Sequence, residues 1–260
     1  MNERAKELVD AMVDAVRKVI AEKQIDYDEY RAGVDFMVQL ANSGEIPLLA
    51  AVLLETSVDE VMHASSRSST TAIRGPYYVP DAPLLTPPVK LPRRSDEPGD
   101  TLLISGTVRD PDGNPLRDAE LDMWQATGET PGRYSNVHPG LPDFNLRGRF
   151  HSKEHGGFEV ETVVPAPYQI HSEGPTGELF ERIGRSTWRP AHLHFTVRHP
   201  GYQTLTAQLF FTDDTYLDSD AANAVKGDLI ITLEKPDRSD TGGEHADYHA
   251  HYDFVLEPSP

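Results

Sequence analysis

The first 62 residues of the chain repeat their hydrophobic positions every three to four residues, which is the period of an α-helix. The pattern predicts an amphipathic helix over about residues 3–22, a second helix that ends at Gly44, and a third from Pro47 to about Met62. Apolar residues occur nearly all round the third helix, so we expect it to be buried between other elements. Residues 65–71 (SSRSSTT) have the composition of a loop.

The second part of the chain has the pattern of β-strands. Prolines are dense from Pro76 to Pro98, which excludes a regular helix and favours an extended connection. Beyond it, apolar and polar residues alternate in short stretches that are separated by turn signals such as PDGNP at 111–115. Strands are predicted at 101–110, 119–126, 158–164, 191–198, 204–212, 228–234 and 249–256. The predicted fold is mainly β, with a helical region over 1–75 followed by a β-sandwich domain over 76–260.

Composition and charge narrow the function classes. The chain has 260 residues and a formal net charge of −18, which disfavours nucleic acid or an anionic membrane as a partner. It contains no cysteine, and this excludes disulfides, thiolate metal sites and cysteine nucleophiles. The charged start MNERAKELVD lacks the apolar stretch of a secretory signal, and the run IPLLAAVLL at 46–54 is too short to span a bilayer. We therefore expect a cytoplasmic protein that does not insert into membranes.

Two groups of histidines are candidates for metal binding. In RPAHLHF at 189–195, His192 and His194 share one face of a predicted strand, because alternate strand residues point the same way. They are either satisfied histidines on a polar strand face or two ligands of a metal. Near the C-terminus, His245, His249 and His251 form a second group, which is more simply explained as incidental histidines on a solvated strand.

Two tyrosines change the balance between these interpretations. Tyr134 lies in the loop sequence GRYSN, and Tyr168 lies in VPAPYQI. With the histidine pair they offer two phenols and two imidazoles. A phenol with a pKa near 10 binds a metal only as phenolate, so it requires a strongly charged cation that prefers oxygen. Ferric iron meets this requirement better than zinc.

A set of longer motifs resembles one enzyme family. The segments run in family order over residues 75–226: GPYYVPDAP, DMWQATGETPGRYS, FNLRGR, VPAPYQI, GPTGELFERIGR, WRPAHLHF, LTAQLFF and YLDSDAANAVK. With its N-terminal helices, the chain is similar to the intradiol ring-cleaving dioxygenases of the catechol 1,2-dioxygenase type. The resemblance implies an enzyme that cleaves a catechol with O2 to a cis,cis-muconate at a non-haem ferric ion, Fe(3+). It implies no organic cofactor.

The resemblance also assigns residues to the site. Tyr134, Tyr168, His192 and His194 match the metal ligands, and Tyr168 matches the tyrosinate that leaves the iron when substrate arrives. Arg189 matches an arginine that faces the substrate ring, and Gln208 matches the glutamine beside it. The residues that match the substrate pocket are Leu48, Ala51, Val52, Ile73, Gly75, Pro76, Tyr77, Tyr78 and Ala222.

The identity of the ring substituent is a further expectation from this resemblance. Related enzymes often carry an aspartate at the position of Ala51 and a cysteine at that of Ala222, so the pocket here is less polar and roomier. We therefore expect chlorocatechols or methylcatechols to be preferred, and plain catechol to be cleaved as well. Hydroxyquinol is the alternative substrate, and a non-catalytic β-sandwich binding module is the alternative from another class. The resemblance implies a homodimer through the N-terminal helices, with a phospholipid as a candidate ligand at its interface.

Overall fold

The structure is a computed structural model that describes residues 2–236 and 246–260. The chain separates into two compact units, Met1–Ile46 and Pro47–Pro260, and each is described by itself. His245, one of the three C-terminal histidines singled out in the sequence, lies outside the described residues.

The first unit consists of the two predicted amphipathic helices. Helix α1 spans Glu3–Lys23, and α2 spans Tyr27–Ser43. Asp26 caps the start of α2 in a capping box with Glu29, and Gly44 ends the helix in the left-handed conformation that a glycine adopts without strain. None of the α1 side chains is buried, and its apolar residues, among them Met12, are exposed.

The third predicted helix is interrupted in the structure. Helix α3 spans Ile46–Ala50, a π-helical turn (η1) spans Ala51–Glu55, and α4 spans Thr56–His63. The expectation that this segment is buried between other elements holds only for part of it, because Val61 and Met62 are 78% and 72% exposed. Only the side that carries Val52 is buried. Apolar residues around a helix therefore did not predict burial here.

No single helix in the described part of the chain is long and apolar enough to cross a membrane. Only the bent pair of Tyr27–Ser43 with Ile46–His63 reaches the necessary length and apolar content when the two parts are taken together.

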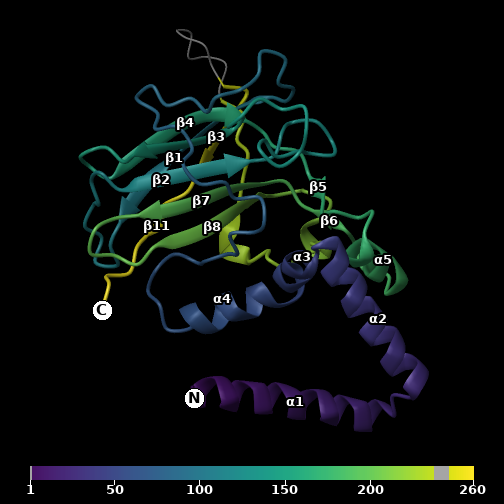
Figure 1. The fold of residues 1–260 in the computed structure, drawn as a ribbon. Coiled ribbons are helices and arrows are strands. Elements are labelled where there is room, and N and C mark those ends of the chain that lie inside the picture. Colours follow the sequence, from purple (N-terminus) through teal and green to yellow (C-terminus); the bar gives the residue numbers. More distant parts are fainter. Residues whose placement is uncertain (1, 237–245) are drawn as a thin grey trace. The chain divides into compact units, whose positions relative to one another are not determined.

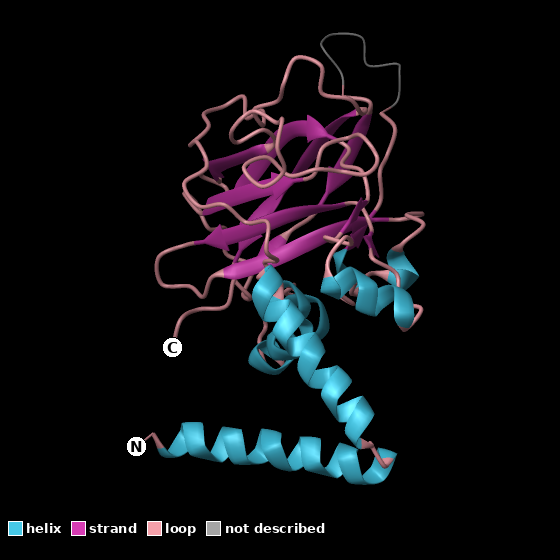
Figure 2. Ribbon diagram, turned by 45° about the vertical axis from the view of Figure 1, so that its right-hand side comes forward, coloured by secondary structure: helices cyan, strands magenta, loops and turns pink. Residues whose placement is uncertain are grey.

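The second unit is a sandwich of two larger sheets, which lie face to face in Figure 1 and Figure 2. In the first sheet, the central strand β1 pairs antiparallel with β4 and parallel with β10 and β11. These strands are β1 (Thr101–Arg109), β4 (Gly157–Val163), β10 (Tyr248–His251) and β11 (Phe254–Val255). The second sheet has the order β3 (Arg147–His151), β2 (Glu120–Gln125), β7 (His192–Arg198), β8 (Leu205–Phe211) and β9 (Ile230–Ile231).

Smaller elements lie outside the two sheets. The short strands β5 (Tyr168–Gln169) and β6 (Trp188–Arg189) form a separate antiparallel pair. Helix α5 spans Pro175–Arg182, and the 3₁₀ turns η2 and η3 span Leu217–Ser219 and Gly227–Leu229.

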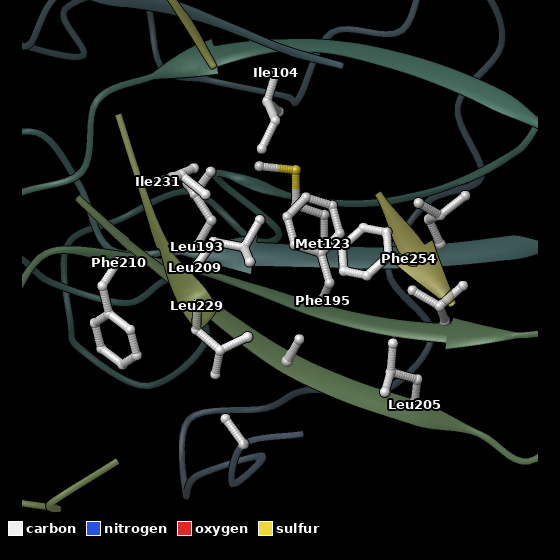
Figure 3. Close-up of a cluster of buried hydrophobic side chains, with 14 of the residues drawn as sticks. Ile104, Met123, Leu193, Phe195, Leu205, Leu209, Phe210, Leu229, Ile231 and Phe254 are labelled. Atoms are coloured by element: carbon white, nitrogen blue, oxygen red, sulfur yellow. The ribbon is translucent and has the colours of Figure 1, made fainter. Parts of the chain in front are cut away.

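The hydrophobic core fills the space between the two larger sheets (Figure 3). Phe158 of β4 and Phe254 of β11 meet Phe195 of β7, with ring centroids 6.2 Å and 5.1 Å from that of Phe195. Since rings from both sheets meet in one cluster, the predicted fold class, a β-sandwich with N-terminal helices, is confirmed.

Several predicted strands are shorter than expected. The strand predicted at 228–234 is reduced to β9, because Gly227–Leu229 form a 3₁₀ turn before it. The strand predicted at 249–256 is divided into β10 and β11, which are separated by Tyr252 and Asp253. The side chain of Asp253 accepts hydrogen bonds from the backbone and hydroxyl of Thr107, and this fixes the break against β1.

Gly106 lies where β1 changes its partner from β10 to β11. A Cβ atom at this position would lie 1.8 Å from the carbonyl oxygen of Tyr252. Because this oxygen belongs to a backbone that is held on both sides by strand pairing, it cannot move without breaking those pairs. We expect Gly106→Ala to lower the free energy of unfolding by about 3 kcal/mol or more, measured by urea denaturation.

The control for this substitution is Gly227→Ala, at a glycine with no atom within 4 Å of a Cβ added there. We expect this variant to unfold within about 0.5 kcal/mol of the natural protein. Equal stability of both variants would contradict the close approach of Tyr252 to β1.

Candidate active site

The site lies on the face of the second sheet that points away from the sandwich core. Along β7, Leu193 and Phe195 point into the core, so His192 and His194 point to the opposite face. Both histidines are buried, and their Nε2 atoms lie 3.0 Å apart. The register pairs His194 with Trp124 of β2 on one side, so a ring from the neighbouring strand lies beside it.

The surroundings of the two imidazoles orient their Nε2 atoms toward each other. His192 Nδ1 lies 2.7 Å from the carbonyl oxygen of Pro190 and donates to it, so the lone pair of the neutral ring is on Nε2. The ring of His194 stacks on Trp124, with centroids 4.6 Å apart and an interplanar angle of 8°. Burial, and next the charge of Arg189, lower the pKa of His192 to about 3. Burial, followed by His192, also lowers the pKa of His194 well below its usual value. Both rings are therefore neutral and suited to bind a metal.

The two predicted tyrosines lie beside the histidines. The ring of Tyr168 in β5 is 5.1 Å from that of Tyr134 and 5.5 Å from that of His192, while Tyr134 is 6.2 Å from His194. The Tyr134 hydroxyl is buried and makes no hydrogen bond of normal geometry to the described residues. Burial, followed by the proximity of Tyr168, raises the pKa of Tyr134 well above its usual value, although Arg189 and Arg147 act in the opposite direction. A buried phenol without a partner is unusual, and a cation at this position would satisfy it.

Arg189 connects one tyrosine to one histidine. The register of β5 and β6 pairs Tyr168 with Arg189, whose Nη1 lies 3.3 Å from Tyr168 Oη and 3.4 Å from His192 Nε2. Arg189 Nη2 donates to Gln208 Oε1 at 2.8 Å. Gln208 Nε2 in turn donates to the carbonyl oxygen of Ile73 at 2.6 Å. The structure thus brings together the six residues that were predicted as ligands or catalytic groups.

Asp220 is part of the same network and was not predicted from the sequence. Its carboxylate accepts from Arg189 Nε at 2.8 Å and from Nη2 at 3.1 Å. Burial alone would raise the pKa of Asp220, but the Arg189 guanidinium holds it below its usual value. Burial likewise opposes the charge of Arg189, but Asp220 and then Tyr168 raise the pKa of Arg189. Arg189 is therefore a permanent cation in the site.

The segment that carries Gly75 and the two following tyrosines lies over the ligand cluster. A Cβ at Gly75 would lie 3.8 Å from His194 Cε1. The ring of Tyr77 is 5.0 Å from that of Tyr134, and the ring of Tyr78 is 4.9 Å from that of Trp124. Next to this segment, a cavity of about 340 Å³ is lined in part by Ile73 and Glu55.

The remaining residues of the predicted pocket differ in their placement. Val52, Ile73 and Ala222 belong to the main hydrophobic cluster, and Leu48 packs against it. Ala51 is half-buried in the π-helical turn, and Pro76 is exposed. Of the nine residues of the predicted pocket, Pro76 is thus the only exposed one, and the others are buried or half-buried.

Among the described residues, no group of three or more His, Asp or Glu side chains is arranged to hold a metal. His249 and His251 lie on β10 without such a group, and His251 is exposed next to Asp253. A metal at β7 would need donors of another type, and Tyr134 and Tyr168 are the phenols beside the histidine pair. Two neutral nitrogens, and two phenols that would lose their protons on binding, suit a trivalent cation such as Fe(III).

Comparison with known proteins gives consistent matches over the whole length. The family model "Dioxygenase" matches residues 73–258, and the model "Catechol dioxygenase N terminus" matches residues 2–70. A chlorocatechol 1,2-dioxygenase of Rhodococcus opacus is 41% identical over 259 residues, which cover 98% of each chain. A hydroxyquinol 1,2-dioxygenase of a Rhizobium species is 33% identical and covers 89% of this chain and 80% of its own.

Solved structures match the fold over the same length. The crystal structure of 3-chlorocatechol 1,2-dioxygenase from Rhodococcus opacus 1CP superimposes with a TM-score of 0.91 at 39% identity, and all of both chains is covered. The structure of a hydroxyquinol 1,2-dioxygenase from Pseudomonas putida has a TM-score of 0.90 at 34% identity and covers 99% of this chain and 93% of its own.

Proposed function

The chain belongs to the dioxygenase family that includes the chlorocatechol and catechol 1,2-dioxygenases, and from this premise we propose that it is an intradiol dioxygenase of substituted catechols. The reaction opens the ring between its two hydroxyl-bearing carbons and incorporates both atoms of O2, giving a cis,cis-muconate. The observation that supports this most is the convergence of two neutral imidazoles and two phenols in one buried cluster.

Fe(III) is the proposed metal, and the residues of the cluster fit it. Among the described residues the Tyr134 hydroxyl has no hydrogen-bond partner of normal geometry, and the Nε2 atoms of His192 and His194 lie only 3.0 Å apart in the same buried cluster. These three residues and Tyr168 would hold the ion. When bound, it supplies Lewis acidity that lowers the pKa of the diol and withdraws electron density from the ring.

Tyr168 and Arg189 have different parts in this proposal. A catechol must lose its two hydroxyl protons: Tyr168, which would hold the ion as a phenolate, would take up one of them on Oη, and a base from the solvent would take the other. Arg189 cannot take up a proton, because it already carries its charge. Its Nη1, which lies 3.3 Å from Tyr168 Oη, donates toward the position where negative charge develops on the ring.

We propose a positioning role for Gln208. Both ends of its side-chain amide are engaged, the oxygen with Arg189 and the nitrogen with the carbonyl of Ile73. The amide therefore fixes the guanidinium relative to the segment that covers the ligand cluster. Gln208, which the resemblance places beside the arginine of the site, would thus act on the reaction through Arg189.

The substrate preference is a testable part of the proposal. Ala51 and Ala222 offer no hydrogen-bonding side chain to a third hydroxyl, so we expect hydroxyquinol to lose hydrogen bonds on binding. A chlorine or methyl group fills apolar space and is worth about 1 kcal/mol, or up to roughly tenfold in specificity. We expect kcat/KM to be higher for 3-chlorocatechol or 4-chlorocatechol than for catechol, with hydroxyquinol the poorest, when measured by O2 uptake.

The alternatives give different outcomes in the same assay. Hydroxyquinol as the best substrate would favour the activity of the relatives named for that compound. Absence of turnover on all four substrates by protein loaded with iron would favour a non-catalytic binding module.

We also propose that residues 1–75 form a dimerisation region of a cytoplasmic homodimer. On α1, Val9, Met12 and Val16 share one face and are 58%, 69% and 59% exposed, which is unusual for a free surface. We expect Met12→Glu to convert the dimer into monomers, measured by light scattering after gel filtration. Lys18→Glu, on the opposite face of α1, should leave the dimer intact.

A phospholipid bound at this interface is a further part of the proposal and is tested by a separate measurement. Mass spectrometry of an organic extract of the purified dimer should detect phospholipid in stoichiometric amount, and Met12→Glu should lose it. An extract without phospholipid would contradict this part of the proposal only.

A further inference from the structure

Asp220 contacts both the arginine of the site and the backbone of the pocket wall. Its Oδ1 accepts from Arg189 Nε at 2.8 Å and from the backbone N–H of Ala222 at 3.2 Å. Its Oδ2 accepts from Arg189 Nη2 at 3.1 Å and from the backbone N–H of Ala224 at 2.8 Å. The side chains of Asp220 and Arg189 are only 2% and 3% exposed. A buried carboxylate is tolerated when its lone pairs are used, and here each oxygen accepts two N–H donors.

These contacts decide which side of the guanidinium faces the site. Arg189 has five N–H donors in a rigid plane. Nε and one N–H of Nη2 are directed at Asp220, and the other N–H of Nη2 is directed at Gln208. Only Nη1 remains, and it points to Tyr168 Oη and His192 Nε2. A rotation of the plane would move Nη1 away from the proposed ligands.

The loop that carries Asp220 has anchors that do not depend on the carboxylate. The backbone N–H of Ala221 donates to the carbonyl of Trp188 at 2.9 Å, and Arg185 Nη2 donates to the carbonyl of Ala221 at 2.9 Å. Thr56 Oγ1 donates to the carbonyl of Ala222 at 3.1 Å. The loop therefore stays attached when the carboxylate is replaced by an amide of the same shape.

We propose that Asp220 is a positioning residue of this site: it holds Arg189 so that Nη1 faces the reacting ring, and it fixes Ala222 of the pocket wall relative to the same guanidinium. This inference rests on the proposed function and deepens it. The hydrogen bonds of the Asp220 carboxylate go to Arg189 and to the backbone of Ala222 and Ala224, so the proposed contribution is exerted chiefly through Arg189 and the wall.

The first test is Asp220→Asn. The amide presents an NH2 group where one carboxylate oxygen accepted from Arg189, so two donors face each other and the guanidinium turns. We expect kcat to fall by about 100-fold, which is typical of a displaced catalytic group. KM for catechol should change by less than about threefold, and iron content and visible absorption should stay unchanged.

The matched control is Asp253→Asn. Like Asp220, Asp253 contacts both an arginine and a backbone N–H group. Its carboxylate lies 3.7 Å from Arg109 Nη2 and accepts a hydrogen bond from the Thr107 N–H at 2.9 Å. Asp253 lies in the break between β10 and β11, beside the other sheet, and its substitution should leave kcat within about twofold. Equal losses in both variants would show a general effect on folding and overturn the proposal.

The decisive test is a double-mutant cycle with Arg189→Ala. If Asp220 acts through Arg189, adding Asp220→Asn to Arg189→Ala should change the residual kcat by less than about threefold. It should also raise the Tm of Arg189→Ala, because it removes a buried carboxylate that has lost its partner. A further 100-fold loss in the double variant would overturn the proposal, and this comparison decides it even if Asp220→Asn alone does not fold.

The same experiments separate this inference from the proposed function. If the natural protein does not cleave catechols, the proposed function fails. If it cleaves them and Asp220→Asn does so at the same rate, only the positioning role of Asp220 fails.

Discussion

Tyr168→Phe is expected to abolish ring cleavage while the protein stays folded. The substitution removes one oxygen and leaves a ring that fills the same buried space between Tyr134 and His192. The variant loses a proposed ligand and the oxygen that accepts a proton from the diol. Loss of a general base alone costs roughly 10²–10⁴-fold, so we expect kcat to fall by at least about 10³-fold.

Spectroscopy distinguishes the loss of a ligand from a general loss of activity. Tyrosinate bound to ferric iron gives a visible charge-transfer band, so Tyr168→Phe should change this band. Tyr202→Phe is the control, because its ring packs against His199 outside the site, with centroids 5.2 Å apart. It should keep the band, and kcat should stay within about twofold. If Tyr168→Phe keeps the colour and the activity of the natural protein, the ligand assignment is wrong.

Arg189→Ala is expected to keep the iron and to lose turnover. The guanidinium contacts Tyr168 Oη at 3.3 Å but cannot itself bind a cation. Removal of one preorganised charge donor costs about 10²–10³-fold in kcat, and we expect a loss in this range. The variant also leaves Asp220 buried without its partner, so we expect it to lose about 3–5 kcal/mol of stability.

The measurement must be made well below the lowered Tm, with iron content and kcat determined on the same sample. Arg109→Ala is the control for the loss of an arginine, because Arg109 ends β1 in the other sheet and its Nη2 lies 3.7 Å from a carboxylate oxygen of Asp253. It should keep both iron and turnover. Loss of iron from Arg189→Ala, with normal turnover in the fraction that keeps it, would contradict the role of Arg189 on the ring.

The elements that could be predicted from the sequence are those whose signal is local. Helices α1 and α2 repeat their apolar residues over 21 and 17 positions, and Gly44 marks an end by its left-handed conformation. By contrast, β5 and β6 have two residues each, which is too short for a period to be recognised. Val61 is exposed although its segment has an apolar pattern. Whether such a segment is buried depends on what packs against it, and the apolar pattern does not contain that information.

In the candidate site, too, the residues with a local sequence signal could be predicted from the strand period, and those without one could not. His192 and His194 are two residues apart on one strand, so their shared face follows from the period of the strand. Asp220 lies 31 residues from Arg189, and a buried arginine requires a partner without indicating where in the sequence it is found. Tyr134 and Tyr168 became candidate ligands only through the chemistry of phenolates and the resemblance to a family.

The central claim is that two tyrosines and two histidines hold one ferric ion, and the visible spectrum of the loaded protein tests it most directly. Protein with one Fe(III) per chain, determined by elemental analysis, is predicted to be red from tyrosinate-to-iron charge transfer, and anaerobic catechol is predicted to shift the band. A colourless protein with full iron occupancy would contradict the assignment of Tyr134 and Tyr168 as ligands.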